Sequence, residues 1–189
     1  MLATRDPAGR PTNGIVRKRT NIQKFPQASA PPNQLTTYIS RELMLGETGS
    51  VAWPAESYLN ISVCNMGSNP LGFAAFPGSP ARRDGVVIDY RCFGASGTAA
   101  APFDLGRTAT HEVCHWLDLL HIWGDDKGLC TQSDNVGDTP NQGGPNGGMP
   151  SFPSISCNNA PDGDLFMNYM DYVDDAAMCM FTHPSLSKW

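Results

Sequence analysis

The sequence has little that would place it in a membrane or on nucleic acid. No apolar run approaches the ~20 residues of a membrane-spanning helix, and residues 1–6 lack the basic and apolar regions of a signal peptide. We therefore expect a soluble chain, with any export signal outside it. Charged residues make up only 16% of the chain, the net charge is −5, and the basic clusters are confined to residues 17–19 and 82–83. That is too little positive charge to follow a phosphate backbone, so neither nucleic acid nor a membrane is an expected partner.

Cysteine spacing excludes two further classes of protein. The six cysteines contain no C-x-x-C pair, which structural zinc ribbons and thioredoxin-like sites require. Six cysteines allow fifteen pairings, and disulfides of an exported protein compete here with plain buried thiols. The length of 189 residues suits one domain, and no internal repeat is visible. The oligomeric state stays open.

The first half of the chain has the pattern of short strands joined by turns, and one clear helix follows it. Four segments are rich in β-forming residues and bounded by Gly, Pro or Asn: 15–20, 58–64, 71–76 and 85–90. Residues 33–42 have some helical character. From 104 to 120 apolar residues recur at helical spacing, with Asp104 as the expected N-cap. Beyond residue 124 about forty residues show no periodicity, and a loop of that length in a compact domain is usually functional, stapled or metal-bound.

The predicted helix carries the chemistry. It contains the run His111-Glu112-Val113-Cys114-His115, and His121 follows, so three of the four histidines lie within eleven residues. Positions i and i+4 share a helix face, so His111 and His115 can present two imidazoles to one ion, with Glu112 beside them. This is the geometry of a zinc peptidase.

A catalytic zinc needs a third protein ligand and one open position. The glutamates are residues 42, 47, 56 and 112, so no distant glutamate follows the motif and the thermolysin-like arrangement is excluded. His121 remains, if the helix ends near residue 118 and the chain turns back, or else an aspartate of the later loop. The spacing H-x-x-x-H-x-x-x-x-x-H is that of metzincins. A closed structural zinc site is the alternative, but it would need a fourth ligand and would leave Glu112 without a purpose.

The motif resembles one metzincin family. Residues 111–124 (HEVCHWLDLLHIWG) and 168–175 (NYMDYVDD) are similar to the pappalysins of the cytophagalysin type, over about residues 3–182. The resemblance implies an α/β fold: an upper subdomain at about 1–121 with a twisted mixed sheet and an active-site helix, and an irregular lower subdomain at about 122–189 with a methionine-bearing turn. It implies Met170 as the methionine of that turn and Tyr172 as the tyrosine near the zinc, which helps hold substrate or stabilise the oxyanion.

This chain departs from the family pattern at several points. Asp118 and Cys114 stand where glycine is usual. Asp tolerates the left-handed turn required at 118, at a cost of about 1 kcal/mol. The thiol of Cys114 can pack inertly or crowd the metal site. The short ends suggest a fragment of a longer precursor.

The resemblance also bears on the disulfides. Of the family's usual two, Cys130 and Cys157 match one, whereas Met149 and Ala177 occupy the positions of the other. Cys179 is then expected to be a free thiol.

The resemblance predicts a secreted, zinc-dependent endopeptidase acting on proteins or peptides. Glu112 would take the proton of a water whose pKa zinc lowers toward ~7. The edge strand of the sheet, with Leu71, Gly72 and Phe73, would bind the peptide by strand addition. Asp175 matches the position at the S1′ pocket, where a carboxylate favours Arg or Lys after the cleaved bond; the alternative is a solvated acid.

Calcium is a second expected ion. Asp134, Asp138 and Thr139 concentrate hard oxygen ligands near Cys130, in a region where similar family members bind calcium; the alternative is an ordinary Asx-rich turn. Two rival functions remain. One is a catalytically impaired pseudo-protease that still binds zinc, because of Cys114 and the missing N-terminal segment. The other is a zinc amidase acting on cell-wall peptides.

Overall fold

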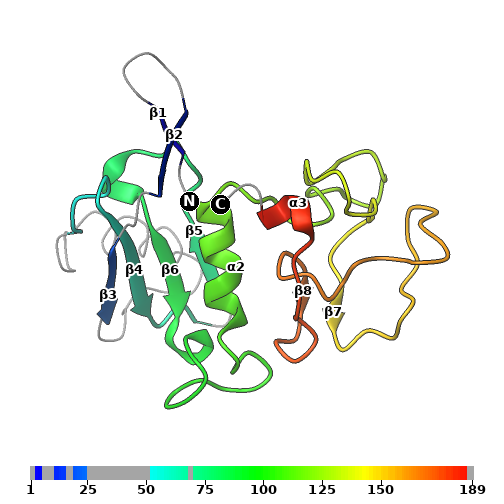
Figure 1. Ribbon diagram of the computed structural model, residues 1–189. Helices are drawn as coiled ribbons and strands as arrows, with labels where there is room; N and C mark the ends of the chain where they lie inside the picture. The colour runs from blue at the N-terminus through cyan, green and yellow to red at the C-terminus, as the bar shows by residue number, and fades with distance from the viewer. Residues whose placement is uncertain (1–2, 6–10, 16–18, 25–51, 68–69, 187–189) are drawn as a thin grey trace.

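The computed structural model describes residues 3–5, 11–15, 19–24, 52–67 and 70–186. A sheet packs on one side of the long helix, and an irregular region lies on its other side (Figure 1). The described strands are β1 (Ala3–Arg5), β2 (Pro11–Ile15), β3 (Arg19–Lys24), β4 (Tyr58–Cys64), β5 (Gly72–Ala74), β6 (Val86–Asp89), β7 (Gly147–Gly148) and β8 (Tyr172–Val173). The described helices are α2 (Arg107–Trp116) and α3 (His183–Leu186), with 3₁₀ turns at Ala81–Arg83 and Tyr90–Cys92. None of the helices in the described ranges has the length and apolar character that crossing a bilayer requires.

The main sheet is mixed, as the family resemblance implied. Its strand order is β3-β4-β6-β5, with β3, β4 and β6 parallel and β5 antiparallel to β6. β5 therefore lies at an edge, and its outer side has no strand partner among the described residues. The predicted edge strand at 71–76 is shorter than expected, since only Gly72–Ala74 form it.

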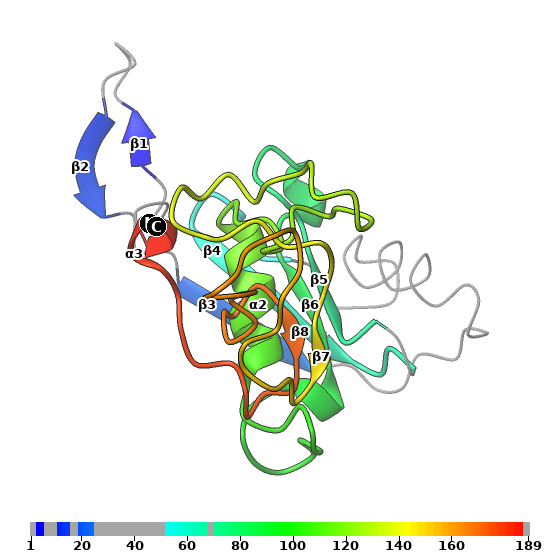
Figure 2. The ribbon, with the colours of Figure 1, turned by 90° about the vertical axis from the view of Figure 1, so that its right-hand side faces the viewer.

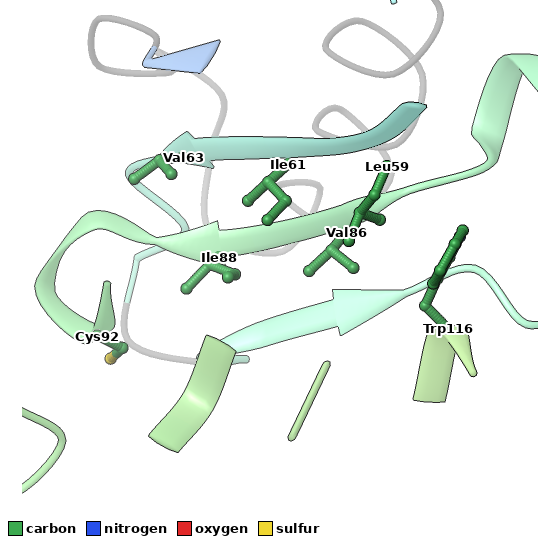
Figure 3. Packing of buried hydrophobic residues seen from close by; sticks show 7 residues of the cluster. All are labelled: Leu59, Ile61, Val63, Val86, Ile88, Cys92 and Trp116. Carbon is green, nitrogen blue, oxygen red and sulfur yellow. The ribbon is translucent and has the colours of Figure 1, made fainter. Parts of the chain in front are cut away.

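The core lies between this sheet and α2. Alternate residues of β4, namely Leu59, Ile61 and Val63, point to the same side as Val86 and Ile88 of β6 (Figure 3). Trp116, in the last turn of α2, packs against them. Full burial of each such aliphatic side chain contributes roughly 1.5–3 kcal/mol, which fixes the helix to the sheet.

The start of α2 differs from the prediction. The N-cap is Gly106, in the left-handed region with φ of 75°, and Asp104 does not cap the helix. The N–H groups of Leu105 and Arg107 donate instead to Oδ2 of Asp175, at 2.7 and 3.2 Å. A carboxylate at this end also interacts favourably with the helix dipole. Periodicity along the chain could not reveal this partner, because it lies some 70 residues away.

The end of α2 has the predicted left-handed turn. Asp118 has φ of 75°, and its N–H donates to the carbonyl of His115, while the N–H of Leu119 donates to that of Cys114. This pair of hydrogen bonds is a Schellman motif, which ends a helix and reverses the chain. Cys114 and Leu119 are both buried in one apolar cluster, the contact that commonly accompanies the motif. The thiol at 114 is therefore part of the packing at the helix end.

Two other expectations near the N-terminus have different outcomes. The strand predicted at 15–20 is wrong as one element. Residue 15 ends β2, which pairs with β1, whereas residue 19 begins β3, which pairs with β4. β-propensity alone could not show that these residues belong to two different strands, because that depends on which strands pair. The helix predicted at 33–42 lies outside the described residues.

The irregular region after residue 121 contains little regular structure and is crossed by one disulfide. Cys130 and Cys157 are bonded, the pair that the family resemblance implied. Cys64, Cys92 and Cys114 are buried thiols, and Cys179 is an exposed one. When the molecule is viewed from the side of the irregular region, β8 and the loops of that region lie over α2 (Figure 2).

Candidate active site

Three histidines converge at the junction of the helix and the irregular region. His111 and His115 come from one face of α2, and His121 is brought to them by the chain reversal at 118. One ring nitrogen from each lies within 4.8 Å of the other two, and Nε2 of His115 is 3.0 Å from Nε2 of His121. They are the one such group of potential metal ligands found within the described ranges.

The other ring nitrogen of each histidine has an acceptor. Nδ1 of His111 donates to the carbonyl of Tyr169 at 2.7 Å, and Nδ1 of His115 donates to that of Leu119 at 2.8 Å. Nδ1 of His121 is 2.5 Å from Oδ1 of Asp125. A neutral imidazole that donates from Nδ1 carries its lone pair on Nε2, which is then the nitrogen that can bind a metal. These partners orient all three rings toward one point, as partners of metal-bound histidines generally do.

Burial keeps the helix histidines uncharged. Burial, and then the proximity of His115, lower the pKa of His111 to about 3. Burial, followed by His121, lowers the pKa of His115 to about 4. Neutral imidazoles are the form that binds metal, so the donor set fits a divalent zinc ion at neutral pH.

Glu112 lies next to the histidines in a confined place. Its carboxyl group is buried, and this burial raises its pKa to about 8. Gly72 of β5 lies against it: a Cβ at position 72 would come within 2.8 Å of Cγ and Oε1 of Glu112. The absence of a side chain at 72 therefore makes room for the glutamate between the helix and the edge strand.

Tyr172 and Trp123 surround the third histidine. The hydroxyl of Tyr172 is 2.9 Å from Nε2 of His121, and the indole of Trp123 stacks on the His121 ring at 4.3 Å. Trp123 also packs edge-on against Tyr172 at 4.8 Å. Tyr172 as a whole is about 50% exposed, and it also lines the cavity beside Glu112. Burial, followed by the charge of Glu112, raises the pKa of Tyr172 to about 12, so it remains a proton donor.

Met170 lies in a tight turn that packs against the end of α2. It is buried in the same apolar cluster as Cys114 and Trp123. The side-chain oxygen of Asn168 accepts from the N–H of Met170, and the backbone carbonyl of Asn168 accepts from the N–H of Asp171. The fully buried Asp171 then accepts from Asn146 and Gln142 of the irregular region. The turn is thereby fixed both to the helix and to the loops.

A cavity of about 380 Å³ opens beside Glu112. Its wall is formed by Pro70, Leu71, Gly72, Phe103, Thr108, His111, Glu112, Asp171, Tyr172, Val173, Asp175 and Met178. It thus brings together the predicted residues of the edge strand, the helix and the turn, but Phe73 is not among its lining residues. Phe103, Thr108 and Met178 are additional lining residues that no motif in the sequence singled out.

Asp175 has two different oxygens in this wall. The side chain is 1% exposed, so it is not the solvated acid of the alternative interpretation. Oδ2 caps α2, whereas Oδ1 is buried and has no hydrogen-bond partner in the described part of the chain. A buried carboxylate oxygen without a partner is costly and calls for a donor.

The loop proposed for calcium is held by hydrogen bonds between its own residues. Both oxygens of Asp134 lie within hydrogen-bond distance of the hydroxyl of Thr139, at 2.8 and 2.9 Å, and Oδ1 accepts from the N–H of Val136. Asp134 is buried, whereas Asp138 is exposed. The loop is therefore closed by its own hydrogen bonds, as in an Asx turn.

Comparison with known proteins identifies the family. A profile of the peptidase family described as "Pregnancy-associated plasma protein-A" matches residues 47–188. The chain belongs to this pappalysin family. Among solved structures, mature mirolysin of Tannerella forsythia in complex with a cleaved peptide is similar, with a TM-score of 0.73 and 49% identity, over 99% of this chain and 67% of that one. The fold is accordingly that of a metzincin-like pappalysin, as the family resemblance implied.

Curated relatives of this pappalysin chain are named extracellular metalloproteases. One from Coccidioides posadasii is 38% identical over 131 residues, which are 66% of this chain and 45% of the relative. One from Verticillium alfalfae is 41% identical over 126 residues, or 62% of this chain and 42% of the relative. The chain thus spans less than half the length of these relatives.

Two residues at the site escaped the sequence analysis. Asp125, which contacts His121, and Trp123, which stacks on it, belong to the run that follows the third histidine. A signal was present, because Asp125 lies four residues after a predicted ligand. It was not used because no regular element was predicted beyond residue 120.

Proposed function

We propose that this pappalysin chain is a secreted, zinc-dependent endopeptidase that cleaves peptide bonds in proteins or peptides. The observation that supports this most is the donor set: three histidines whose Nδ1 atoms all have acceptors and which bring one ring nitrogen each within 4.8 Å of the others, beside a buried glutamate. The names of the curated relatives favour both the activity and secretion.

The residues fit a catalytic zinc better than a structural one. His111, His115 and His121 would hold the ion, which leaves one tetrahedral position open beside Glu112 and the cavity. Zinc in such a site activates water and polarises a carbonyl group. Glu112 would receive the proton of the attacking water and pass it to the leaving amine. A nearby divalent cation lowers the pKa of a carboxyl group, which would bring Glu112 into its basic form near neutral pH.

Tyr172 and β5 would hold the substrate. The Tyr172 hydroxyl, directed at the ligand cluster, is placed to donate to an oxyanion there. The outer edge of β5 offers main-chain groups to an extended peptide, which can be bound by strand addition. Leu71 and Gly72 line the cavity, so a peptide along this edge would direct side chains into it.

The test compares the wild type with Glu112→Gln and His121→Ala on casein. We expect wild-type cleavage that 1,10-phenanthroline abolishes, Glu112→Gln that retains zinc but loses cleavage, and His121→Ala that loses zinc. A wild type that binds zinc stoichiometrically but cleaves nothing would favour the pseudo-protease. Cys114→Gly then tests whether the thiol impairs the site. We expect little effect, because burial raises the pKa of Cys114 to about 12 and so keeps the thiol inert.

We further propose that Asp175 gives a preference for Arg or Lys after the cleaved bond. Its buried Oδ1 faces no donor among the described residues, and its side chain lines the cavity. A cationic side chain entering there would supply the missing donor. Such a charge-assisted hydrogen bond is worth about 1.5–3 kcal/mol, or roughly ten- to more than hundred-fold in discrimination. Arg should exceed Lys if the contact is bidentate.

The capping role of Asp175 decides how this specificity is tested. Asp175→Ala would remove the helix cap as well, whereas Asp175→Asn keeps an oxygen for the N–H groups of Leu105 and Arg107, removes the charge and places a donor NH2 group where Oδ1 faces the cavity. Cleavage-site mapping on a peptide library should show a strong preference for Arg and Lys in the wild type and a weak one in Asp175→Asn. Equal preferences in the two proteins, or wild-type cleavage before Leu as readily as before Arg, would exclude the assignment.

Calcium at Asp134, Asp138 and Thr139 remains a lesser proposal. The buried carboxylate of Asp134 and the exposed one of Asp138 supply hard oxygen atoms, and Asp134 also has hydrogen-bond contacts with Thr139 and Val136. Thermal melting in EGTA and in millimolar calcium tests this, with an unchanged melting temperature excluding a structural calcium ion.

A further inference from the structure

The third histidine is oriented by a different kind of group from the first two. His111 and His115 donate to backbone carbonyls, whose positions the fold fixes. His121 donates to a side chain, the carboxylate of Asp125, at 2.5 Å. The Asp125 side chain is 66% exposed, against 16% for His121.

The backbone between the two residues is held in a turn that makes this contact. The N–H of Gly124 donates to the carbonyl of His121 at 2.8 Å, and that of Asp126 donates to the carbonyl of Trp123 at 3.1 Å. Gly124 and Asp125 both have positive φ, at 62° and 57°. A Cβ at position 124 would lie 2.6 Å from the backbone of Ser133, so the loop that contains Ser133 packs directly on this turn.

The next residue anchors the turn from the other side. Asp126 is buried, and its carboxylate accepts from the N–H groups of Leu129, Thr131 and Gln132 at 2.5 to 2.9 Å. The turn is thus fixed at both ends, and Asp125 is held in a backbone conformation that few residues other than Gly, Asn and Asp adopt readily.

We infer that Asp125 is a positioning residue for the metal site, which fixes the tautomer and the ring orientation of His121 so that its Nε2 faces the ion. The other contacts of the His121 ring cannot do this. Trp123 stacks on its face and leaves the in-plane orientation free, and Tyr172 lies at the nitrogen that must be vacated for the metal. A carboxylate behind a metal-bound histidine typically improves metal affinity 10- to 100-fold. The inference rests on the proposed zinc site.

Two substitutions separate the carboxylate from the backbone. Asp125→Gly removes the acceptor and suits the positive φ, so it should not strain the turn. Asp125→Asn also tolerates this conformation and keeps an oxygen that can accept from Nδ1, but it removes the charge. Asn158→Gly is the backbone control, since Asn158 has φ of 56° and is remote from the histidines in sequence. Asp162→Asn is the control for loss of an exposed charge.

The measurement is zinc affinity of the full chain, by competition with a chromophoric chelator, together with urea unfolding of the zinc-free proteins. We expect Asp125→Gly to bind zinc about 10- to 100-fold more weakly than the wild type, with Asp125→Asn in between. Unfolding of the zinc-free proteins and both controls should be nearly unchanged. In 1 M NaCl the wild type and Asp125→Asn should converge, because salt screens an exposed charge, while Asp125→Gly stays weaker.

The outcomes distinguish this inference from the proposed function. If the wild type fails to bind zinc, the proposed function itself is wrong. If the wild type binds zinc and Asp125→Gly binds it within about twofold, the inference is overturned while the metallopeptidase assignment stands. It is also overturned if Asn158→Gly weakens zinc binding as much as Asp125→Gly does.

Discussion

At Glu112 the proposed function and the stability of the fold conflict. The carboxyl group of this proposed general base is buried, and the burial raises its pKa to about 8 from the usual 4.5. An unfolded chain would ionise this carboxyl group near pH 4.5, whereas the metal-free folded protein cannot do so until the pH is near 8. The folded state therefore becomes less stable as the pH rises through this window.

Replacement of Glu112 by Gln should remove this loss. In EDTA, the two proteins should differ least near pH 4.5, and the wild type should lose about 2–4 kcal/mol of unfolding free energy relative to Glu112→Gln between pH 4.5 and 8. Urea unfolding at a series of pH values measures this difference.

The comparison between the two proteins cancels the effect of the helix histidines. Their pKa values are lowered, so they cost stability when the pH falls below about 6.5, in both proteins alike. A difference that stays flat from pH 4.5 to 8 would mean that Glu112 ionises normally in the folded protein.

At the scale of elements, the candidate site depends on the contact between α2 and β5. α2 crosses the edge strand β5, and Gly72 is the point at which the Glu112 side chain meets the strand. A side chain at 72 would meet the flexible end of the glutamate, so the glutamate and not the backbone would have to shift.

Gly72→Ala should therefore reduce activity with little change in folding. We expect kcat/KM on a peptide substrate to fall about 10- to 100-fold, because displacement of a catalytic group by about 1 Å costs on that order. Zinc content and unfolding free energy should stay near the wild-type values. Gly144→Ala is a matched control, since a Cβ there meets nothing within 4 Å. Full activity of Gly72→Ala would show that Glu112 tolerates the added methyl group.

At the scale of the whole molecule, the irregular region contacts the helix that carries two of the proposed zinc ligands. The carbonyl of Tyr169 orients His111 across 58 residues, and Asp175 caps the start of α2 across 68 to 70 residues. Met170 packs under the end of the same helix. Loss of order in the later loops would thus misplace residues of the helix.

The disulfide should contribute measurably to this order. It joins cysteines 27 residues apart, and replacing both Cys130 and Cys157 by Ser should cost about 2–4 kcal/mol, because the unfolded chain regains the loop-closure entropy. Urea unfolding without reductant measures this, with Cys179→Ser as the control because that thiol is exposed and free. If the double variant has the same unfolding free energy as the control, the hydrogen bonds of the irregular region and not the disulfide stabilise it.

The sequence by itself determined the features that depend on near neighbours. The spacing of His111, Glu112 and His115 on a helix, the reversal that Asp118 permits, and the buried strands around Val86 follow from local geometry and periodicity. The family motifs led to the mixed sheet and to the Cys130–Cys157 pair.

Only the tertiary structure decided what closes the site. The cap of α2 moved from Asp104 to Asp175, the Nδ1 partner of His111 came from the methionine turn, and the cavity drew its wall from segments that share no local pattern. These contacts join residues far apart in the chain, where no repeat of 2 or 3.6 residues links the partners. They are set by how the irregular region folds back onto α2, and this depends on the whole packing rather than on any one segment.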